Sequence, residues 1–273
     1  MSPRMAKAII NGLLAGGALI ALFPLLWMVS VSLMHPGEAS ALPPPLIPVH
    51  ATLYNYHELF VRAGMGRYLF NSLLVSVAIT VLSLGLNLLA GYAFAKLRFA
   101  GRESLFKALV GMLVIPAQVT MLPLFLMLKH IGLVNNYGGV IVPAMASAFG
   151  IFLVRQDARG IPDELMEAAR IDGASELRIF MQIVLPLLKP IMVTLAIFTF
   201  LTAWNDFMWP LIVLTGQEHY TLPLGLASLA REHAQDSELM MAGSVITVVP
   251  VLVLFLALQR YYLEGLLLGS VKG

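Results

Sequence analysis

The sequence contains no cysteine and few charged residues. Without cysteine, the chain cannot form disulfides, thiolate metal sites, iron–sulfur clusters or a cysteine nucleophile. Only 12% of the 273 residues are charged and 59% are hydrophobic, whereas soluble domains have about 25% charged and about 45–50% apolar residues. This composition excludes a soluble globular protein, because too few charges remain to cover a surface in water. It also excludes a disordered chain, which combines low hydrophobicity with high net charge.

Sequence motifs for phosphate binding and hydrolysis are missing as well. The sequence has no Gly-x4-Gly-Lys-Ser/Thr phosphate loop, no His-Glu-x2-His pair and no Gly-x-Ser-x-Gly turn. The six histidines are not spaced as metal ligands, and the net charge of +2 does not indicate a nucleic-acid partner. We therefore predict no catalytic residue, no metal site and no nucleic-acid partner for this chain.

Long apolar runs are abundant instead. A helix needs roughly 20 apolar residues to cross a hydrocarbon core about 30 Å thick. The runs are continuous, whereas a membrane β-barrel would show alternating stretches of about ten residues. The first run is also longer than the apolar part of a signal peptide, so we expect an uncleaved span there. The sequence predicts an all-α polytopic membrane protein with six transmembrane helices, at about 8–33, 68–95, 108–128, 138–154, 188–214 and 239–259.

The distribution of lysine and arginine predicts the orientation of these helices. Cytoplasmic loops of membrane proteins carry an excess of these two residues. With the N-terminus in the cytoplasm, most of the 17 lysines and arginines lie on the cytoplasmic side. The exceptions are Arg62, Arg67, Lys129 and Arg231. Six spans then place both termini in the cytoplasm.

The cytoplasmic stretch 155–186 is too long for a simple connection between two spans. Pro162 suits the first turn of a helix, and Gly173 suits its end, because glycine tolerates the left-handed conformation. Ser175 can cap a second short helix, for which we expect an apolar stripe formed by Leu177, Phe180, Met181 and Val184. Such an element either fits a groove on another protein or lies on the lipid surface as an amphipathic connector.

One motif in this stretch identifies a family. Glu167-Ala168-Ala169, Gly173 after three residues, and Ile183-Val184-Leu185-Pro186 after nine more match the pattern EAA-x3-G-x9-I-x-L-P. This pattern resembles the cytoplasmic coupling loop of binding-protein-dependent ABC importer permeases. The resemblance implies a coupling site for an ATPase. Its predicted residues are Glu167, Ala168, Ala169, Asp172, Gly173, Ile183, Leu185 and Pro186.

Further stretches are similar to the carbohydrate-uptake permeases, in particular to the shorter subunit of the maltose and glycerol-phosphate type. They are Asn71-Ser72, residues 91–99, residues 135–137, residues 204–210 and Val271-Lys272-Gly273. The resemblance implies a permease subunit for a sugar or sugar-like solute. An importer of polyamines or amino acids remains the alternative. A secondary transporter is a further alternative, although it requires an inverted repeat that the sequence does not clearly show.

The resemblance also implies the other subunits of an importer complex. A second homologous permease would complete the pathway, and an extracytoplasmic solute-binding protein would deliver the solute. Two cytoplasmic ATPases would bind ATP and magnesium, so this chain would hold no cofactor itself. The expected location is the inner membrane of a bacterium.

Polar residues within the spans are the candidates for the solute pathway. Asp206 is the only carboxylate well inside a span, with Asn205 beside it, and Gln118 lies between two prolines of the third span. The alternatives are an acid at the outer interface and a packed proline kink. In the second span, Asn87 and Thr80 are predicted to form hydrogen bonds to neighbouring helices.

Overall fold

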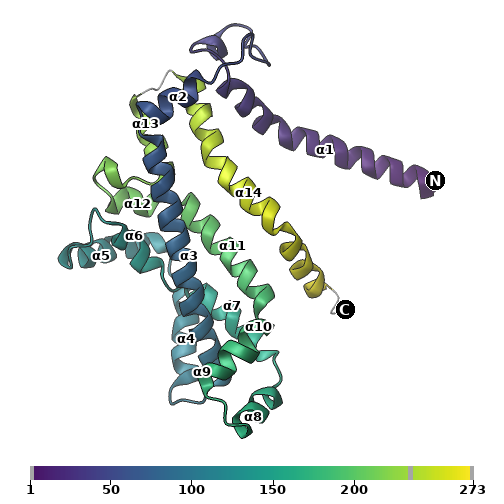
Figure 1. Cartoon of the computed structure of the whole chain (residues 1–273), viewed down its shortest axis with the longest axis vertical. Helices are drawn as coiled ribbons and strands as arrows, with labels where there is room; N and C mark the ends of the chain where they lie inside the picture. Colours follow the sequence, from purple (N-terminus) through teal and green to yellow (C-terminus); the bar gives the residue numbers. More distant parts are fainter. Residues whose placement is uncertain (1–2, 233–235, 271–273) are drawn as a thin grey trace. The chain divides into compact units, whose positions relative to one another are not determined.

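The computed structural model of this chain describes residues 3–232 and 236–270, and the regular elements in these ranges are all helices (Figure 1). The predicted all-α fold class is therefore confirmed. The motif Val271-Lys272-Gly273 lies outside the described residues. The chain divides into two compact units, Met1–Leu69 with Leu222–Pro250 and Phe70–Thr221 with Val251–Gly273.

The first unit is held together by hydrogen bonds near the ends of its helices. The buried Asn55 donates from Nδ2 to the carbonyl oxygens of Ser32 and Met34 at 3.0 and 2.8 Å. Glu238, also buried, accepts a hydrogen bond of 2.8 Å from the amide of Ala39. The helices are α1 (Pro3–Ser32), η1 (Glu38–Ser40), α2 (Tyr54–Val61), the start of α3 (Met65–Lys96), α13 (Leu222–Glu232) and the first part of α14 (Ser237–Ser270).

The second unit contains most of α3 and the helices that follow it. These are α4 (Arg102–Met112), α5 (Ala117–His130), α6 (Tyr137–Ala144), α7 (Ala148–Arg159), α8 (Asp163–Ile171), α9 (Glu176–Ile179), η2 (Phe180–Val184), α10 (Leu185–Leu187), α11 (Lys189–Asn205), α12 (Met208–Val213) and η3 (Gln217–His219). The remainder of α14 also belongs to this unit. Helices α8 and α9 lie at one end of the unit, beside the end of α3 (Figure 1).

Among the residues that the structure describes, four helical stretches are long and apolar enough to cross a membrane: Ile9–Ser32, Met65–Lys96, Tyr137–Arg159 and Ser237–Ala257. They overlap the first, second, fourth and sixth expected spans. The third and fifth expected spans fall on bent pairs of helices. Six spans result only if each bent pair counts as one.

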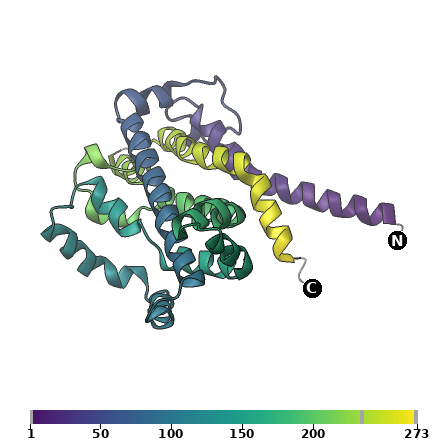
Figure 2. The ribbon, with the colours of Figure 1, turned by 60° about the horizontal axis from the view of Figure 1, so that its bottom comes forward.

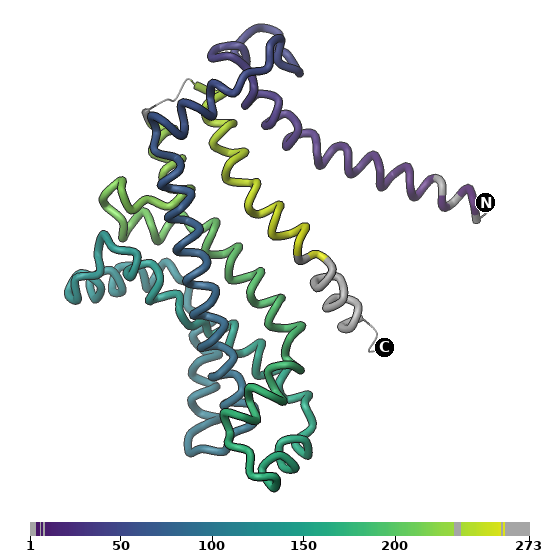
Figure 3. Tube along the Cα trace, in the orientation of Figure 1, coloured from purple at the N-terminus to yellow at the C-terminus, as the bar shows by residue number. Residues whose placement is uncertain are grey.

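The structure changes two expectations about the spans. The run 108–128 is not one helix, since α4 and α5 meet at 104° (Figure 2 and Figure 3). The break ends at Pro116, which disfavours the helical conformation for the residue before it. The run 188–214 ends as a helix at Asn205, because Asp206 is extended, with φ −68° and ψ 121°.

Helices α3 and α7 are joined by a buried amide side chain. Asn87 accepts a 3.0 Å hydrogen bond from the amide of Ser147, the residue that caps α7. The expected bond between helices is thus confirmed for Asn87. It is wrong for Thr80, whose hydroxyl donates to the carbonyl oxygen of Ser76 in its own helix at 2.6 Å.

Candidate functional site

The candidate site is the stretch that carries the Glu-Ala-Ala motif, residues 155–186, called the EAA segment here. Its first helix, α8, starts at Asp163 directly after Pro162, which is extended and precedes the helix instead of lying in its first turn. Asp163 and Glu164 stand at this helix N-terminus, where negative charge is favourable. Local sequence signals therefore account for the start of the helix.

The end of α8 is a glycine turn. Gly173 has a φ of +78°, a left-handed conformation that side chains with a Cβ adopt at a cost. The amide of Ala174 donates to the carbonyl oxygen of Ala169 at 2.9 Å, and that of Gly173 to Arg170 at 3.0 Å. This pair of bonds is the Schellman arrangement that terminates helices. The predicted glycine turn is confirmed.

The second helix, α9, begins after Ser175, whose hydroxyl accepts a hydrogen bond of 3.4 Å from the amide of Arg178. It continues through the π-helical turn η2 into α10 and then α11. The expected cap is therefore present, and the EAA segment leads directly into a helix of the fifth expected span.

The EAA segment is packed onto three long helices through an apolar core. Met166 of α8 is buried together with Ile179, Phe180 and Val184 of the second helix. The same core contains Leu88 and Tyr92 of α3, Val154 and Ala158 of α7, and Leu195 of α11. Displacement of the segment therefore acts on the packing of all three helices.

Part of the expected apolar stripe faces outward. Phe180 and Val184 are buried as expected, but Leu177 and Met181 are 66% and 52% exposed. Ile179 takes the buried place instead, and the π-helical turn from Phe180 onward changes the helical period on which the expectation rested. The segment thus presents apolar side chains away from its own core. Ile171, at the end of α8, is 87% exposed.

The predicted coupling residues do not converge on one point. Glu167 and Ala168 lie exposed on α8 and Ala169 is half-buried. Asp172 and Gly173 are exposed in the turn. Beyond the turn, Ile183 and Leu185 are half-buried and Pro186 is exposed. Within the described part of the chain, the Glu167 carboxylate makes neither a hydrogen bond nor an ion pair, so it is available to a partner.

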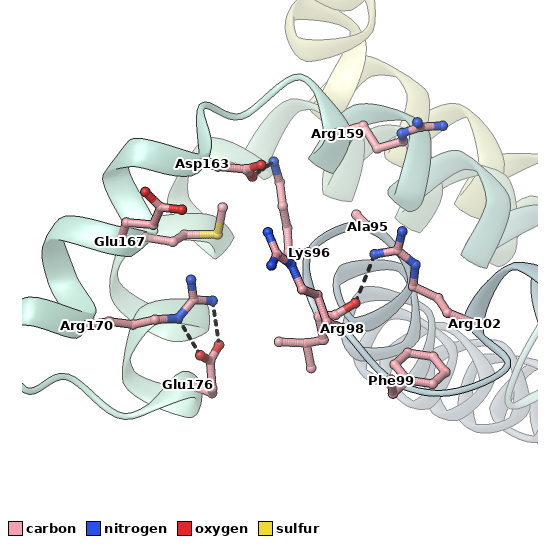
Figure 4. A pocket seen from close by; sticks show the side chains of 12 residues that line it. Ala95, Lys96, Arg98, Phe99, Arg102, Arg159, Asp163, Glu167, Arg170 and Glu176 are labelled. Atoms are coloured by element: carbon pink, nitrogen blue, oxygen red, sulfur yellow. Dashed lines mark hydrogen bonds and ion pairs between the residues drawn. The ribbon is translucent and has the colours of Figure 1, made fainter.

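A cleft of about 860 Å³ lies between α8 and the end of α3 (Figure 4). Its charged lining residues are Lys96, Arg98, Arg102, Arg159, Asp163, Glu167, Arg170 and Glu176. Two contacts connect α3 to the EAA segment here, Lys96 with Asp163 and Tyr92 with Glu176. Neither contact is predictable from a local sequence pattern, because 67 and 84 residues separate the partners.

Only one of the three candidate pathway residues lines a cavity in the described chain. Asp206 lines a cavity of about 590 Å³ together with Trp209 and Thr202, among others. Gln118 and Asn205 do not line this cavity; Gln118 is exposed on α5, and Asn205 donates to the carbonyl oxygen of Leu201 in its own helix. Asp206 caps α12 by accepting a 3.3 Å hydrogen bond from the amide of Trp209.

Comparison with known proteins identifies similar chains along nearly the whole length. Residues 19–264 match the family described as binding-protein-dependent transport system inner membrane component. The arabinooligosaccharides transport system permease protein AraQ of Halalkalibacterium halodurans is 42% identical over 99% of each chain. The sn-glycerol-3-phosphate transport system permease protein UgpE of Escherichia coli O1:K1 is 33% identical over 92% of each chain. A chain in the crystal structure of a bacterial ABC transporter that imports the acidic polysaccharide alginate has a TM-score of 0.84 at 25% identity. The match covers 96% of this chain and 99% of that one.

Proposed function

Since this chain belongs to the family of binding-protein-dependent transport system inner membrane components, we propose that it is a permease subunit of an ATP-driven importer for a sugar or sugar-like solute. The observation that carries the proposal is the 42% identity to an arabinooligosaccharide permease over the whole chain. Other relatives are named for glycerol 3-phosphate and alginate transport, which are also sugar-like solutes. A polyamine or amino-acid importer is the alternative that the test below distinguishes.

In the proposed topology, six spans cross the inner membrane and both termini lie in the cytoplasm. The pair α4 and α5 then serves as one broken span, whereas α11 forms the fifth span by itself, because the helices directly before it belong to the cytoplasmic EAA segment. A break within a membrane is tolerated where the freed backbone groups face protein or a water-filled cavity. The turn before α5 leads to Ala117 and Thr120, which line the 590 Å³ cavity, so this break suits a span that borders a pathway.

In the proposed assembly, the EAA segment fits into a groove on a cytoplasmic ATPase. The exposed Glu167 would anchor the segment by a charge-assisted hydrogen bond, and the small side chains of Ala168 and Ala169 would let the partner approach closely. The exposed Ile171 and Leu177 supply apolar surface for the same contact. Movement of the ATPases would then pass through the segment into α3, α7 and α11.

The other components follow from the same proposal. A second permease, homologous or identical, would form the pathway together with this chain. Two ATPases would bind ATP and magnesium, since this sequence has no phosphate-binding loop. A solute-binding protein would deliver the solute. Asp206 is the proposed pathway residue of this chain, whereas Gln118 and Asn205 stay predictions that no contact in the described chain supports.

Stimulation of ATP hydrolysis by the loaded solute-binding protein tests the solute class. The complex is purified through a tag on this chain, its subunits are identified by mass spectrometry, and it is reconstituted in lipid. We expect arabinose oligosaccharides, glycerol 3-phosphate or another sugar on the solute-binding protein to raise ATP hydrolysis. Polyamines and amino acids serve as the comparison. Stimulation by these solutes and by no sugar would contradict the carbohydrate assignment.

A further inference from the structure

Two polar side-chain contacts join α3 to α8 and α9, and Figure 4 shows the first of them, between Lys96 and Asp163 in the cleft. In the first, the Lys96 ammonium contacts Asp163 Oδ1 at 2.6 Å and the carbonyl oxygen of Ile161 at 2.5 Å. The Lys96 side chain is only 5% exposed, whereas that of Asp163 is 72% exposed. A buried ammonium requires partners, so Lys96 is bound to the start of α8. The hydrogen bond and the positive charge of Lys96 also lower the pKa of the Asp163 carboxyl group.

The second contact joins α3 to α9 and, through an ion pair, to the other end of α8. The Tyr92 hydroxyl donates to Glu176 Oε2 at 2.9 Å. The same carboxylate accepts from Arg170 Nε at 2.7 Å and from a second guanidinium nitrogen of Arg170 at 3.3 Å. Because Arg170 lies on α8 and Glu176 on α9, Tyr92 is connected to both helices on either side of the Gly173 turn.

The two contacts act on one face of α3. Tyr92 and Lys96 are four residues apart, and residues at this spacing lie one above the other on a helix. The partner of Lys96, Asp163, is the first residue of α8. The partner of Tyr92, Glu176, lies on α9 and binds Arg170, the residue next to the last of α8. Apolar packing has no directional preference, whereas hydrogen bonds depend steeply on angle. Two directional contacts therefore determine the orientation of α8 on α3.

We propose that Tyr92 and Lys96 are positioning residues that hold the EAA segment in one orientation on α3 and so transmit its movement into this helix. The proposal rests on the proposed function, because it requires an ATPase that moves the segment. Without these contacts, the segment would remain packed through Met166 and Phe180. It could then rotate against the apolar core when the ATPase moves it, and α3 would not follow.

The variants that test this proposal remove the contacts and preserve the packing. Tyr92→Phe removes only the hydroxyl and keeps the ring, whose centre is 5.2 Å from that of Phe180. Lys96→Met removes the charge and keeps an unbranched apolar stem, and leaves Asp163 in solvent. Tyr56→Phe is the matched tyrosine control, because it removes another hydroxyl in a 2.8 Å hydrogen bond, to Ser32 of the first unit. Lys129→Met is the lysine control, because it removes the charge of an exposed lysine on α5, outside the EAA segment.

The measurement is the amount of solute imported per ATP hydrolysed in proteoliposomes, together with the melting temperature of the complex. For the double variant Tyr92→Phe/Lys96→Met we expect normal assembly, normal ATP hydrolysis and about tenfold less import per ATP. Tenfold corresponds to the contribution of one or two hydrogen bonds to charged groups. The two control variants are expected to import normally. The charge exchange Lys96→Glu/Asp163→Lys is expected to restore import relative to Lys96→Glu alone.

Two results would overturn the proposal. Unchanged import per ATP in the double variant would show that the contacts transmit nothing. Loss of the assembled complex in Tyr92→Phe or in Lys96→Met would show that they are folding contacts. If no ATPase subunit co-purified with the unaltered chain, the proposed function itself would fail. This result is seen before any variant is made.

Discussion

Replacing Gly173 with valine is expected to lower solute import by at least about tenfold while the ATPases remain active. Gly173 has a φ of +78°. A residue with a Cβ in this left-handed region costs about 1–2 kcal/mol, and a β-branched residue costs more because its χ1 is restricted. No atom lies within 4 Å of the position a Cβ would take. The expected effect therefore arises from the backbone and not from a steric clash.

The strain at Gly173 is relieved if the turn opens, which breaks the bonds that end α8 and changes the angle between α8 and α9. The measurement is solute import and ATP hydrolysis by the same proteoliposomes. Gly173→Asn should retain more import than Gly173→Val, since asparagine tolerates the left-handed region. Gly132→Val is the matched control, because Gly132 has a φ of +74° and also has open space around it, outside the EAA segment. Equal loss of import per ATP in both valine variants would contradict a specific role for the Gly173 turn.

The second large effect is expected at Gly91, where α3 packs tightly against α7. A Cβ on Gly91 would lie 2.5 Å from Val154 Cγ1 and 3.1 Å from the backbone nitrogen of Arg155. Inserting atoms into a packed core costs about 1–3 kcal/mol or more. Gly91→Val is therefore expected to prevent assembly of a stable complex. The measurement is the yield of monodisperse complex and its melting temperature.

Gly85→Val provides the matched control in the same helix, because no atom lies within 4 Å of its Cβ position. This variant should assemble like the unaltered chain. Adding Val154→Ala to Gly91→Ala removes Val154 Cγ1, the nearest clashing atom, but keeps Val154 Cβ at 2.6 Å, so it should recover only part of the lost stability. If Gly91→Val and Gly85→Val assembled equally well, the close approach of α3 and α7 would not be needed for the fold.

Local signals in the sequence predicted the EAA segment well. Pro162, Gly173 and Ser175 each act on the backbone within a few residues, so the two short helices and their turn follow from local chemistry. The apolar stripe was only half right, because Leu177 and Met181 are exposed. Which side of a short helix is buried depends on the helices around it, and the sequence of the segment does not contain this information.

The features that sequence reasoning missed depend on distant residues or on the size of a bend. Two prolines around Gln118 indicated a kink, but not that α4 and α5 would meet at 104°. The contacts of Tyr92 and Lys96 join residues 84 and 67 positions apart, and neither spacing forms a recognisable pattern. Asn205 and Asp206 are neighbours in the sequence, yet only Asp206 lines the cavity, because the helix ends between them.

The most direct test of ATPase coupling uses the absence of cysteine, which makes every introduced thiol unique in this chain. A cysteine replaces Ile171, which is 87% exposed at the end of α8, and the control cysteine replaces Leu42, which is 96% exposed in the first unit. A bifunctional reagent that joins thiols to lysines is then added to the purified, import-competent complex. We expect a covalent product between Ile171→Cys and the ATPase subunit, and none between Leu42→Cys and that subunit. An import-competent complex in which Ile171→Cys forms no such product, or in which Leu42→Cys forms it instead, would contradict docking of the ATPase on the EAA segment.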